Sequence, residues 1–351
     1  MSKLKTLPIK ALEKVFGYLG LSVIAKRGVV ALGRCRRGIH QGILNSFTMD
    51  ASRYGSFAIM GLTPRQMSDG QLLSRLCMLA HGIEKGFSFR ERKIPFFVEK
   101  FPVFLNLFEE ADRRDLIKSS FQGDMSVNGL RAYKRVHTDE QFLQSYAERV
   151  DKLLERYADF PEREPAIAAS PKDSQLDPEA FKLFFESRSS TRAFSDREVP
   201  RSEVEWALEC AMKTPSVCNR QPWRVKNFTD RSQIDEALSY QNGNRGFGHE
   251  APGLLVIGCD LRAFFGNTER NEAYVDSGLF AMSVMMALHA KGISSCSLNW
   301  CIPPEINEKF LNHCDLPPWF EVGMFLAYGY PLSEDLDVAR SPRKSLEDLL
   351  L

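Results

Sequence analysis

The sequence lacks two short motifs that mark dedicated nucleotide-binding sites. Its 351 residues contain no Gly-x-Gly-x-x-Gly of the Rossmann type and no P-loop. Both motifs work because their glycines let the backbone approach a phosphate closely at the start of a helix. A nucleotide that visits this chain would therefore have no Rossmann or P-loop site of its own.

Long apolar runs, excess charge and paired cysteines are also missing. The best candidate for a membrane span, residues 15–25, stops at Lys26-Arg27 and is shorter than the roughly 20 apolar residues that a span requires. A net charge of +1 excludes an overall attraction to nucleic acid. The eight cysteines show neither metal-type spacing nor a small disulfide framework. We therefore expect a cytoplasmic chain that binds no metal and no nucleic acid.

Charge of one sign does gather at the start of the chain. Before Asp50 there are nine lysines and arginines and only one acidic residue, Glu13. Apolar residues are interleaved with these charges in a helix-like pattern. Residues 1–40 can be interpreted as a peripheral helix on the anionic inner face of a membrane, or as a solvated helix that packs on its own domain or on a partner. The sequence leaves both interpretations open.

Two regions of different pattern follow. Helices are predicted, from apolar positions at three- and four-residue spacing, over residues 65–79, 94–108 and 139–157. Residues 161–178 are rich in proline, alanine, serine and charge, which is typical of a linker. We therefore predict a mostly helical region over residues 1–165, which acts as a cap or in docking, and a second domain over residues 175–351.

The second domain alternates between helical and extended patterns. Helices are predicted over residues 177–186, 200–212, 232–240, 271–291 and 304–314. Strands are predicted over residues 223–228, 254–259, 293–298 and 322–330. The helix over residues 271–291 carries apolar side chains around most of its circumference. It must be buried on most sides, in a core or in a subunit interface.

Two segments of this domain combine residue types suited to a phosphorylated cofactor. They are Arg188-Ser189-Ser190-Thr191-Arg192 and Pro215-Ser216-Val217-Cys218-Asn219-Arg220-Gln221-Pro222-Trp223. Arginine suits a phosphate dianion because its planar fork makes paired, charge-assisted hydrogen bonds. Serine and asparagine suit a sugar-like chain and a polar ring edge because each can donate and accept. Either segment alone is compatible with a solvated loop. The presence of both in one domain indicates a cofactor site.

Together the two segments resemble the FMN-binding signature of the nitroreductase family, whose usual form is Arg-Arg-Ser-x-Arg followed by Pro-Ser-x-x-Asn-x-Gln-Pro-Trp. The resemblance covers roughly residues 180–350. It implies FMN contacts by Arg188, Ser189, Ser190 and Arg192 of the first segment and by Ser216, Asn219 and Gln221 of the second. Ser189 stands where a second basic residue is common in the family, which implies a modestly weaker phosphate affinity.

The family's pattern continues toward the C-terminus. Gly329-Tyr330-Pro331 and the segment that begins at Arg343 resemble the family's Gly-Tyr-Pro and its Arg-Lys-Pro-Leu-Glu ending, so Arg343 is implied as a second phosphate ligand. Family members often place a glycine where a backbone N–H meets the flavin N5 atom. Here Leu298-Asn299-Trp300 stands at that place, so Leu298 and Asn299 would supply the contact and Trp300 would lie on the substrate side.

The resemblance implies a fold and an activity. The fold is α+β, with a mixed, mainly antiparallel sheet flanked by helices, in a homodimer whose flavins are lined by both chains. The activity is a ping-pong transfer of hydride from NAD(P)H to flavin N5 and then to an electron-poor small molecule. No catalytic side chain is assigned, because the cofactor carries the chemistry.

The first 170 residues are not part of the ordinary family domain. Within them, His81-Gly82-Ile83-Glu84-Lys85-Gly86 is either a polar helix end closed by Gly86 or part of a cap that places His81 near a substrate. A cap that meets only substrate predicts that FMN binding survives deletion of residues 1–170. Two further functions stay open: a specialised flavoenzyme acting on a polysaccharide or peptide precursor, and a catalytically silent FMN-binding scaffold at a membrane surface.

Overall fold

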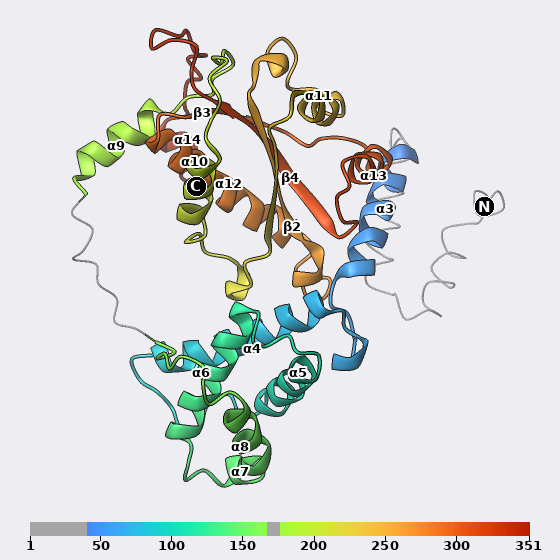
Figure 1. Ribbon diagram of the computed structural model, residues 1–351, viewed down its shortest axis with the longest axis vertical. Helices are drawn as coiled ribbons and strands as arrows, with labels where there is room; N and C mark the ends of the chain where they lie inside the picture. Colours follow the sequence, from blue (N-terminus) through green and yellow to red (C-terminus); the bar gives the residue numbers. More distant parts are fainter. Residues whose placement is uncertain (1–40, 167–175) are drawn as a thin grey trace, which may run out of the picture. The chain divides into compact units, whose positions relative to one another are not determined.

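The computed structural model describes residues 41–166 and 176–351 (Figure 1). Contacts divide the chain into two compact units, Met1–Ser52 and Arg53–Leu351. The predicted basic helix over residues 1–40, with its membrane contact, lies outside the described residues. The first described helix, α3 (Gln41–Phe57), has no counterpart among the helices predicted from the sequence.

Residues 64–156 form a group of helices around an apolar core of their own. The elements are η2 (Pro64–Gln66), α4 (Asp69–Ser88), α5 (Phe101–Arg113), α6 (Phe121–Val136), α7 (Gln141–Gln144) and α8 (Ala147–Arg156). Fully buried aromatic rings dominate the core, among them Phe101, Phe104, Phe108 and Tyr133. Helix α4 begins at a capping box, in which Ser68 and Gln71 satisfy each other's backbone N–H groups. The predicted helical character of the N-terminal region is confirmed for these residues.

A four-stranded sheet forms the centre of the second half. Its order is β1 (Trp223–Phe228), β2 (Gly253–Asp260), β4 (Phe320–Gly329) and β3 (Ser294–Leu298). Each neighbouring pair is antiparallel. An isolated parallel bridge joins Ser190 to Ser295 on β3, so the sheet is mixed but mainly antiparallel.

Helices cover both faces of this sheet. They are α10 (Arg201–Ala211), α11 (Arg231–Ser239), α12 (Glu272–Ala290) and α13 (Pro304–His313). Because side chains alternate along a strand, Leu255 and Ile257 of β2 pack with α10 and α12, whereas Leu254 and Val256 pack with α11 and α13. Figure 1 shows the two pairs of helices on either side of β2 and β4. The predicted α+β fold class is confirmed.

Helix α12 is the central helix of the layer that it shares with α10. Among the described residues it alone has the length and composition of a membrane span, which corrects the expectation that the chain has no such segment. It contacts β1, β2, β3, β4 and α10, so we interpret it as the core helix of this layer. One side remains exposed and carries Tyr274, Val275, Leu279 and Met282.

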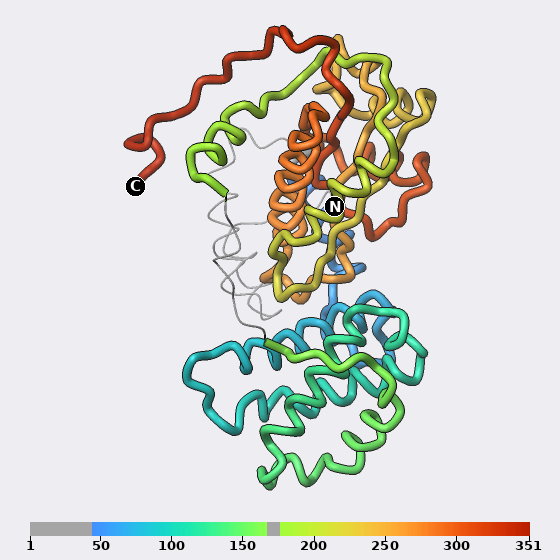
Figure 2. Tube along the Cα trace, turned by 60° about the vertical axis from the view of Figure 1, so that its left-hand side comes forward, coloured from blue at the N-terminus to red at the C-terminus, as the bar shows by residue number. Residues whose placement is uncertain are grey.

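The ends of the described chain also bear on this domain. Tyr54 and Phe57 pack against the core between the sheet and α12, and Ile59 exchanges backbone hydrogen bonds with Phe264 and Gly266 at 2.8 and 3.0 Å. Residues before 60 thus contact the second predicted domain, and the division at residues 165–175 stays a prediction. After β4 the chain runs as an extended tail (Figure 2), which includes the short helix α14 (Leu346–Leu349).

Candidate functional site

The segment Arg188–Arg192 follows α9 (Pro178–Ser187) and runs beside β3. Arg188 is the C-cap residue of α9. The backbone N–H of Thr191 donates to the carbonyl oxygen of Ser295 at 3.1 Å, which holds the segment against the strand. Ser189 and Ser190 are half-buried between the two arginines.

Positive charge at this edge of the sheet is not neutralised. Neither Arg188 nor Arg192 has an acidic partner among the described residues, and Arg192 lies 5.9 Å from the ring centre of Phe247. Burial raises the pKa of the Cys296 thiol on β3, and the charges of Arg192 and Arg188 act against that rise. The edge is therefore suited to an anion.

The second segment is a tight loop over residues 216–221. Cys218, Asn219 and Gln221 have φ values of 51°, 54° and 50°, in the left-handed region that non-glycine residues rarely occupy. Ser216 Oγ accepts the backbone N–H of Gln221 at 3.0 Å, and Gln221 Nε2 donates to Asn219 Oδ1 at 3.2 Å. The three residues implied in flavin contact are thus brought together.

The side chain of Arg220 is buried beneath this loop and supports it. The sequence did not identify Arg220 as a site residue. Its side chain is only 2% exposed. Nε donates to the carbonyl oxygen of Val217 at 3.1 Å, and Nη1 donates to that of Ala263 at 2.6 Å and to Glu269 Oε2 at 2.8 Å. The remaining nitrogen, Nη2, is buried without a partner among the described residues.

Asp276 on α12 is a second anchor that sequence reasoning missed. Its two carboxylate oxygens each lie 3.3 Å from the backbone nitrogen of Val217. Burial raises the pKa of Asp276 to about 6, and the nearby charges of Glu272 and Glu269 add to the rise. Trp223, the last residue of the second cofactor segment, donates Nε1–H to the backbone oxygen of Asp276 at 3.1 Å.

The two cofactor segments lie toward opposite ends of α12. The loop is bonded to Asp276, whereas Ser187, next to Arg188, is hydrogen-bonded to His289 at 2.8 Å. His289 comes 13 residues after Asp276 on the same helix. At 1.5 Å per residue the two positions are about 20 Å apart. The two predicted segments are thus anchored at well-separated positions along one helix.

The end of β3 and the residues that follow it are well fixed. Leu298 is buried and pairs with Phe325, and the backbone oxygen of Asn299 accepts Gln241 Nε2–H at 2.9 Å. The indole of Trp300 stacks on Phe325 at 4.5 Å between ring centres, and its Nε1–H donates to Asn307 at 2.8 Å. Trp300 is thus held in the core beside α13, and its place on the substrate side stays a prediction.

Arg343 lies apart from the other predicted cofactor residues. It is exposed in the C-terminal tail, where its guanidinium donates to the backbone oxygen of Ser341. Its role at a phosphate stays a prediction.

His81 lies within α4, which corrects the interpretation of a helix end. The helix continues past Gly86 to Ser88, and its C-cap residue is Phe89. His81 Nδ1 lies 3.0 Å from Glu84 Oε2. One turn earlier on the same helix, Cys77 Sγ donates to the backbone oxygen of Asn219 at 3.3 Å. This contact argues against a cap that deletion could remove without effect on the FMN site.

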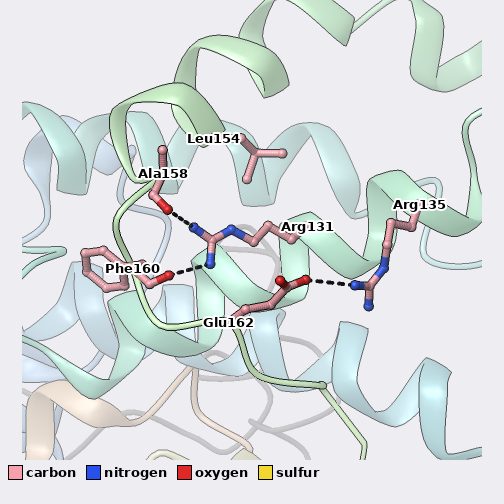
Figure 3. Close-up of a pocket in the computed structure, with 6 residues that line it drawn as sticks. All are labelled: Arg131, Arg135, Leu154, Ala158, Phe160 and Glu162. Carbon is pink, nitrogen blue, oxygen red and sulfur yellow. Dashed lines mark hydrogen bonds and ion pairs between the residues drawn. The ribbon is translucent and has the colours of Figure 1, made fainter.

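A cavity of about 360 Å³ lies between α6 and α8 in the helical region (Figure 3). Two arginines line it, but both are engaged. Arg131 donates to the backbone oxygens of Ala158 and Phe160 at 3.1 and 2.9 Å, and Arg135 pairs with Glu162 at 3.0 Å. These bonds fasten the chain after α8 to α6, so we interpret the cavity as structural.

Comparison with known proteins gives one family. The sequence model of the Nitroreductase family matches residues 185–241 and 229–330. The matched stretch contains Arg188–Arg192, the 216–221 loop, α12 and all four strands. The helices α4 to α8 and the tail that contains Arg343 lie outside it.

Individual proteins and one solved structure are similar to part of this chain. A 4-nitrobenzoate reductase from Nocardioides sp. is 26% identical, over 34% of this chain and 68% of its own. A protein from Archaeoglobus fulgidus, provisionally named an NADH dehydrogenase/NAD(P)H nitroreductase, is 27% identical over 44% of this chain and 87% of its own. A crystal structure of a provisionally named nitroreductase from Desulfovibrio desulfuricans in complex with FMN is 21% identical and covers 50% of this chain and 97% of its own, with a TM-score of 0.43.

Proposed function

We propose that the protein is an FMN-dependent oxidoreductase that uses NAD(P)H to reduce an electron-poor small molecule, because the Nitroreductase family model matches residues 185–241 and 229–330 of this α+β fold. The names of its relatives, a 4-nitrobenzoate reductase and an NAD(P)H-linked protein, support this proposal. Turnover is ping-pong: the nicotinamide donor leaves before the acceptor binds. This order suits a chain without a Rossmann or P-loop motif, because donor and acceptor then share one pocket.

The observation that carries the proposal is the pair of unneutralised guanidinium groups at Arg188 and Arg192. They are the complement of a phosphate dianion, and charge-assisted hydrogen bonds are the strong ones. Arg343 of the C-terminal tail is the third proposed phosphate ligand. When bound, FMN supplies the hydride-transfer chemistry at its N5 atom.

The remaining contacts are assigned to polar groups that the structure holds in place. Ser189 and Ser190 are proposed to bind the ribityl chain. The flavin ring edge is proposed to meet Ser216, Asn219 and Gln221, with the backbone at Leu298 and Asn299 near N5. The left-handed loop fits this role because its shape is fixed before any ligand binds, which lowers the entropic cost of binding.

We also propose a homodimer, in which each FMN site takes one segment from each chain. The two segments are anchored about 20 Å apart along α12, and this supports the proposal because a second copy of the chain can place its own loop beside the Arg188 segment. The exposed side of α12 between them carries Tyr274, Val275, Leu279 and Met282. An apolar patch of this kind on a core helix is typical of a subunit interface.

The proposed cytoplasmic location rests on the cysteines. All seven cysteines among the described residues are free. They include the half-buried Cys218 and the exposed Cys301. Free thiols of this number persist in a reducing compartment.

Spectroscopy of the purified protein tests the proposal. The protein should be yellow and should release FMN on denaturation, and it should oxidise NADH or NADPH when 4-nitrobenzoate is supplied. A flavin-loaded protein that oxidises neither donor would instead be the catalytically silent scaffold. A colourless protein that does not bind FMN in a fluorescence titration would overturn the proposed function.

A further inference from the structure

We propose that His81 and Glu84 of α4 form a proton-donating dyad on the acceptor side of the flavin site, with His81 Nε2 as the atom that meets the acceptor. This inference rests on the proposed function and extends it. It assigns a chemical role to a helix that lies outside the residues matched by the family.

Two helices of the N-terminal region touch the 216–221 loop. Cys77 Sγ of α4 donates to the backbone oxygen of Asn219 at 3.3 Å. The side-chain amide of Asn219 lies 3.9 Å from Met125 Sδ of α6. Asn219 is one of the residues assigned to the flavin ring, so α4 and α6 lie directly against the proposed cofactor site.

The dyad lies on the same side of α4 as this contact. Cys77, His81 and Glu84 are four and three residues apart, a spacing that places side chains on one helix face. His81 is therefore one turn, about 6 Å along the axis, from the residue that touches the loop. Burial first, and then the charge of Glu84, raise the pKa of Cys77 to about 12, which agrees with a carboxylate close to that contact.

The geometry of the pair leaves one imidazole nitrogen available. His81 Nδ1 lies 3.0 Å from Glu84 Oε2, so the carboxylate accepts the Nδ1–H and fixes the orientation of the ring. Nε2 has no hydrogen-bond partner among the described residues, and the two side chains are 27% and 25% exposed. His137 differs, because both of its ring nitrogens are engaged, with Tyr133 and Phe96.

Two glycines in the segment His81–Gly86 help to fix the orientation of this part of α4. A Cβ atom at Gly82 or Gly86 would clash with the rings of Phe97 and Phe96. The two glycines therefore let these rings pack directly on the helix backbone. His81 and Glu84 lie on a neighbouring face, so the packing on one side holds the dyad on the other.

The proposed reaction balances with one hydride and one proton per acceptor. A nitro group takes the hydride on nitrogen and the proton on one oxygen, and loss of water then gives the nitroso product. His81, as the imidazolium, gives the proton from Nε2 and becomes neutral. Glu84 keeps its charge throughout and stabilises the imidazolium, which solvent regenerates.

Separate half-reactions of the full-length, FMN-loaded protein test the dyad. The variants are His81→Gln, Glu84→Gln and, as a control at an exposed cation one turn after His81 that takes no part in the pair, Lys85→Gln. His81→Gln should leave FMN content and anaerobic flavin reduction by NADH or NADPH unchanged. It should slow flavin reoxidation by 4-nitrobenzoate or 1,4-benzoquinone by about 100-fold or more, as expected for loss of a general acid. Glu84→Gln should slow it by about tenfold, and Lys85→Gln should not slow it.

A binding measurement without turnover distinguishes the dyad from a structural role. Titration of the oxidised protein with 4-nitrobenzoate, followed by flavin absorbance, should show about tenfold weaker binding for His81→Gln, the loss of one hydrogen bond. Unchanged reoxidation and unchanged binding in His81→Gln would overturn the dyad while leaving the proposed function intact. A wild-type protein without FMN, or one whose reduced flavin neither acceptor reoxidises, would overturn the proposed function and the dyad with it.

Discussion

The carboxylate of Asp276 lies 3.3 Å from the backbone nitrogen of Val217 and ties the 216–221 loop to the core helix α12. Helix and loop are 59 residues apart in sequence. The bond is made by a buried acid, so the anchor of the proposed flavin loop is also a titratable group.

Asp276→Asn should remove a pH dependence of stability. Burial raises the pKa of Asp276 from 3.8 to about 6 in the folded protein, so the folded state binds the proton more tightly than the unfolded state. The contribution of this group to stability is therefore full below about pH 4 and is lost as pH rises through about 6. Asparagine still accepts the Val217 N–H and carries no charge. The melting temperature of the variant should exceed that of the wild type by more at pH 8 than at pH 5.

Asp230→Asn provides a control of opposite sign. Asp230 caps α11, and hydrogen bonds from Ser232 and the backbone of Gln233 lower its pKa. Its contribution to stability is present at neutral pH and is lost in acid, so this variant should be less stable than the wild type at pH 8. Equal shifts of the Asp276→Asn melting temperature at pH 5 and pH 8 would contradict the role of the buried acid.

Removal of a proposed phosphate ligand should weaken FMN binding. Arg188→Ala and Arg343→Ala each lose a charge-assisted contact worth about 1.5–3 kcal/mol, which corresponds to a 10- to 150-fold higher dissociation constant. Fluorescence titration of the apoprotein with FMN measures this dissociation constant. Arg201→Ala is the control, because Arg201 is an exposed arginine paired with Glu205 on α10. An affinity that falls equally in all three variants would argue for a general charge effect and against a phosphate site.

A charge on the exposed side of α12 should dissociate the proposed dimer. Leu279 is 46% exposed, and Leu279→Asp places an unpaired carboxylate in the proposed apolar interface. Sedimentation should then give a species near the chain mass of 39.9 kDa, with loss of bound FMN. Met212→Asp, at a 60% exposed methionine after α10, should leave the dimer intact. A wild-type protein that sediments as a flavin-loaded monomer would contradict the interface.

The buried ion pair of Arg220 and Glu269 should contribute more to the free energy of unfolding than an exposed ion pair does. Arg220→Ala removes the ion pair with Glu269 at 2.8 Å and two further bonds, to the backbone oxygens of Val217 and Ala263. Breaking a buried pair typically costs about 3–5 kcal/mol, against less than about 1 kcal/mol for an exposed pair such as Arg201 with Glu205. Urea unfolding of the two alanine variants measures the difference. Similar losses in both would show that Arg220 does not hold the loop.

Local sequence patterns were enough to predict the four strands of the sheet, but they did not predict every helix. The strands begin and end within two residues of the predicted bounds, because apolar runs of strand length are short and sharply bordered. Helix α6 was not predicted. It contains Gly123, Asn128 and Gly129, which disfavour helices locally, and the buried face that includes Tyr133 overrides that preference. Gly123 is itself required there, because a Cβ would meet the backbone of Ile117.

The sequence indicates the residues that are proposed to contact the cofactor, but it does not indicate the residues that hold them in place. Arg188 and Asn219 belong to a motif of characteristic spacing. Arg220 and Asp276 act through partners 49 and 59 residues away, and no local pattern marks such pairs. The contact of Cys77 with Asn219 spans 142 residues and involves a region outside the family match, so only the three-dimensional structure reveals it.

That last contact also has a consequence for synthesis of the chain on the ribosome. We expect the helices α4 to α8, which have an apolar core of their own, to fold before the strands that follow them are made, because domains generally fold in order from the N-terminus. At 5–20 residues per second, Asn219 follows Cys77 out of the ribosome after about 7–30 s. The 216–221 loop therefore forms against a surface that is already folded, and the N-terminal helices serve as an intramolecular template for the strained turn beside them.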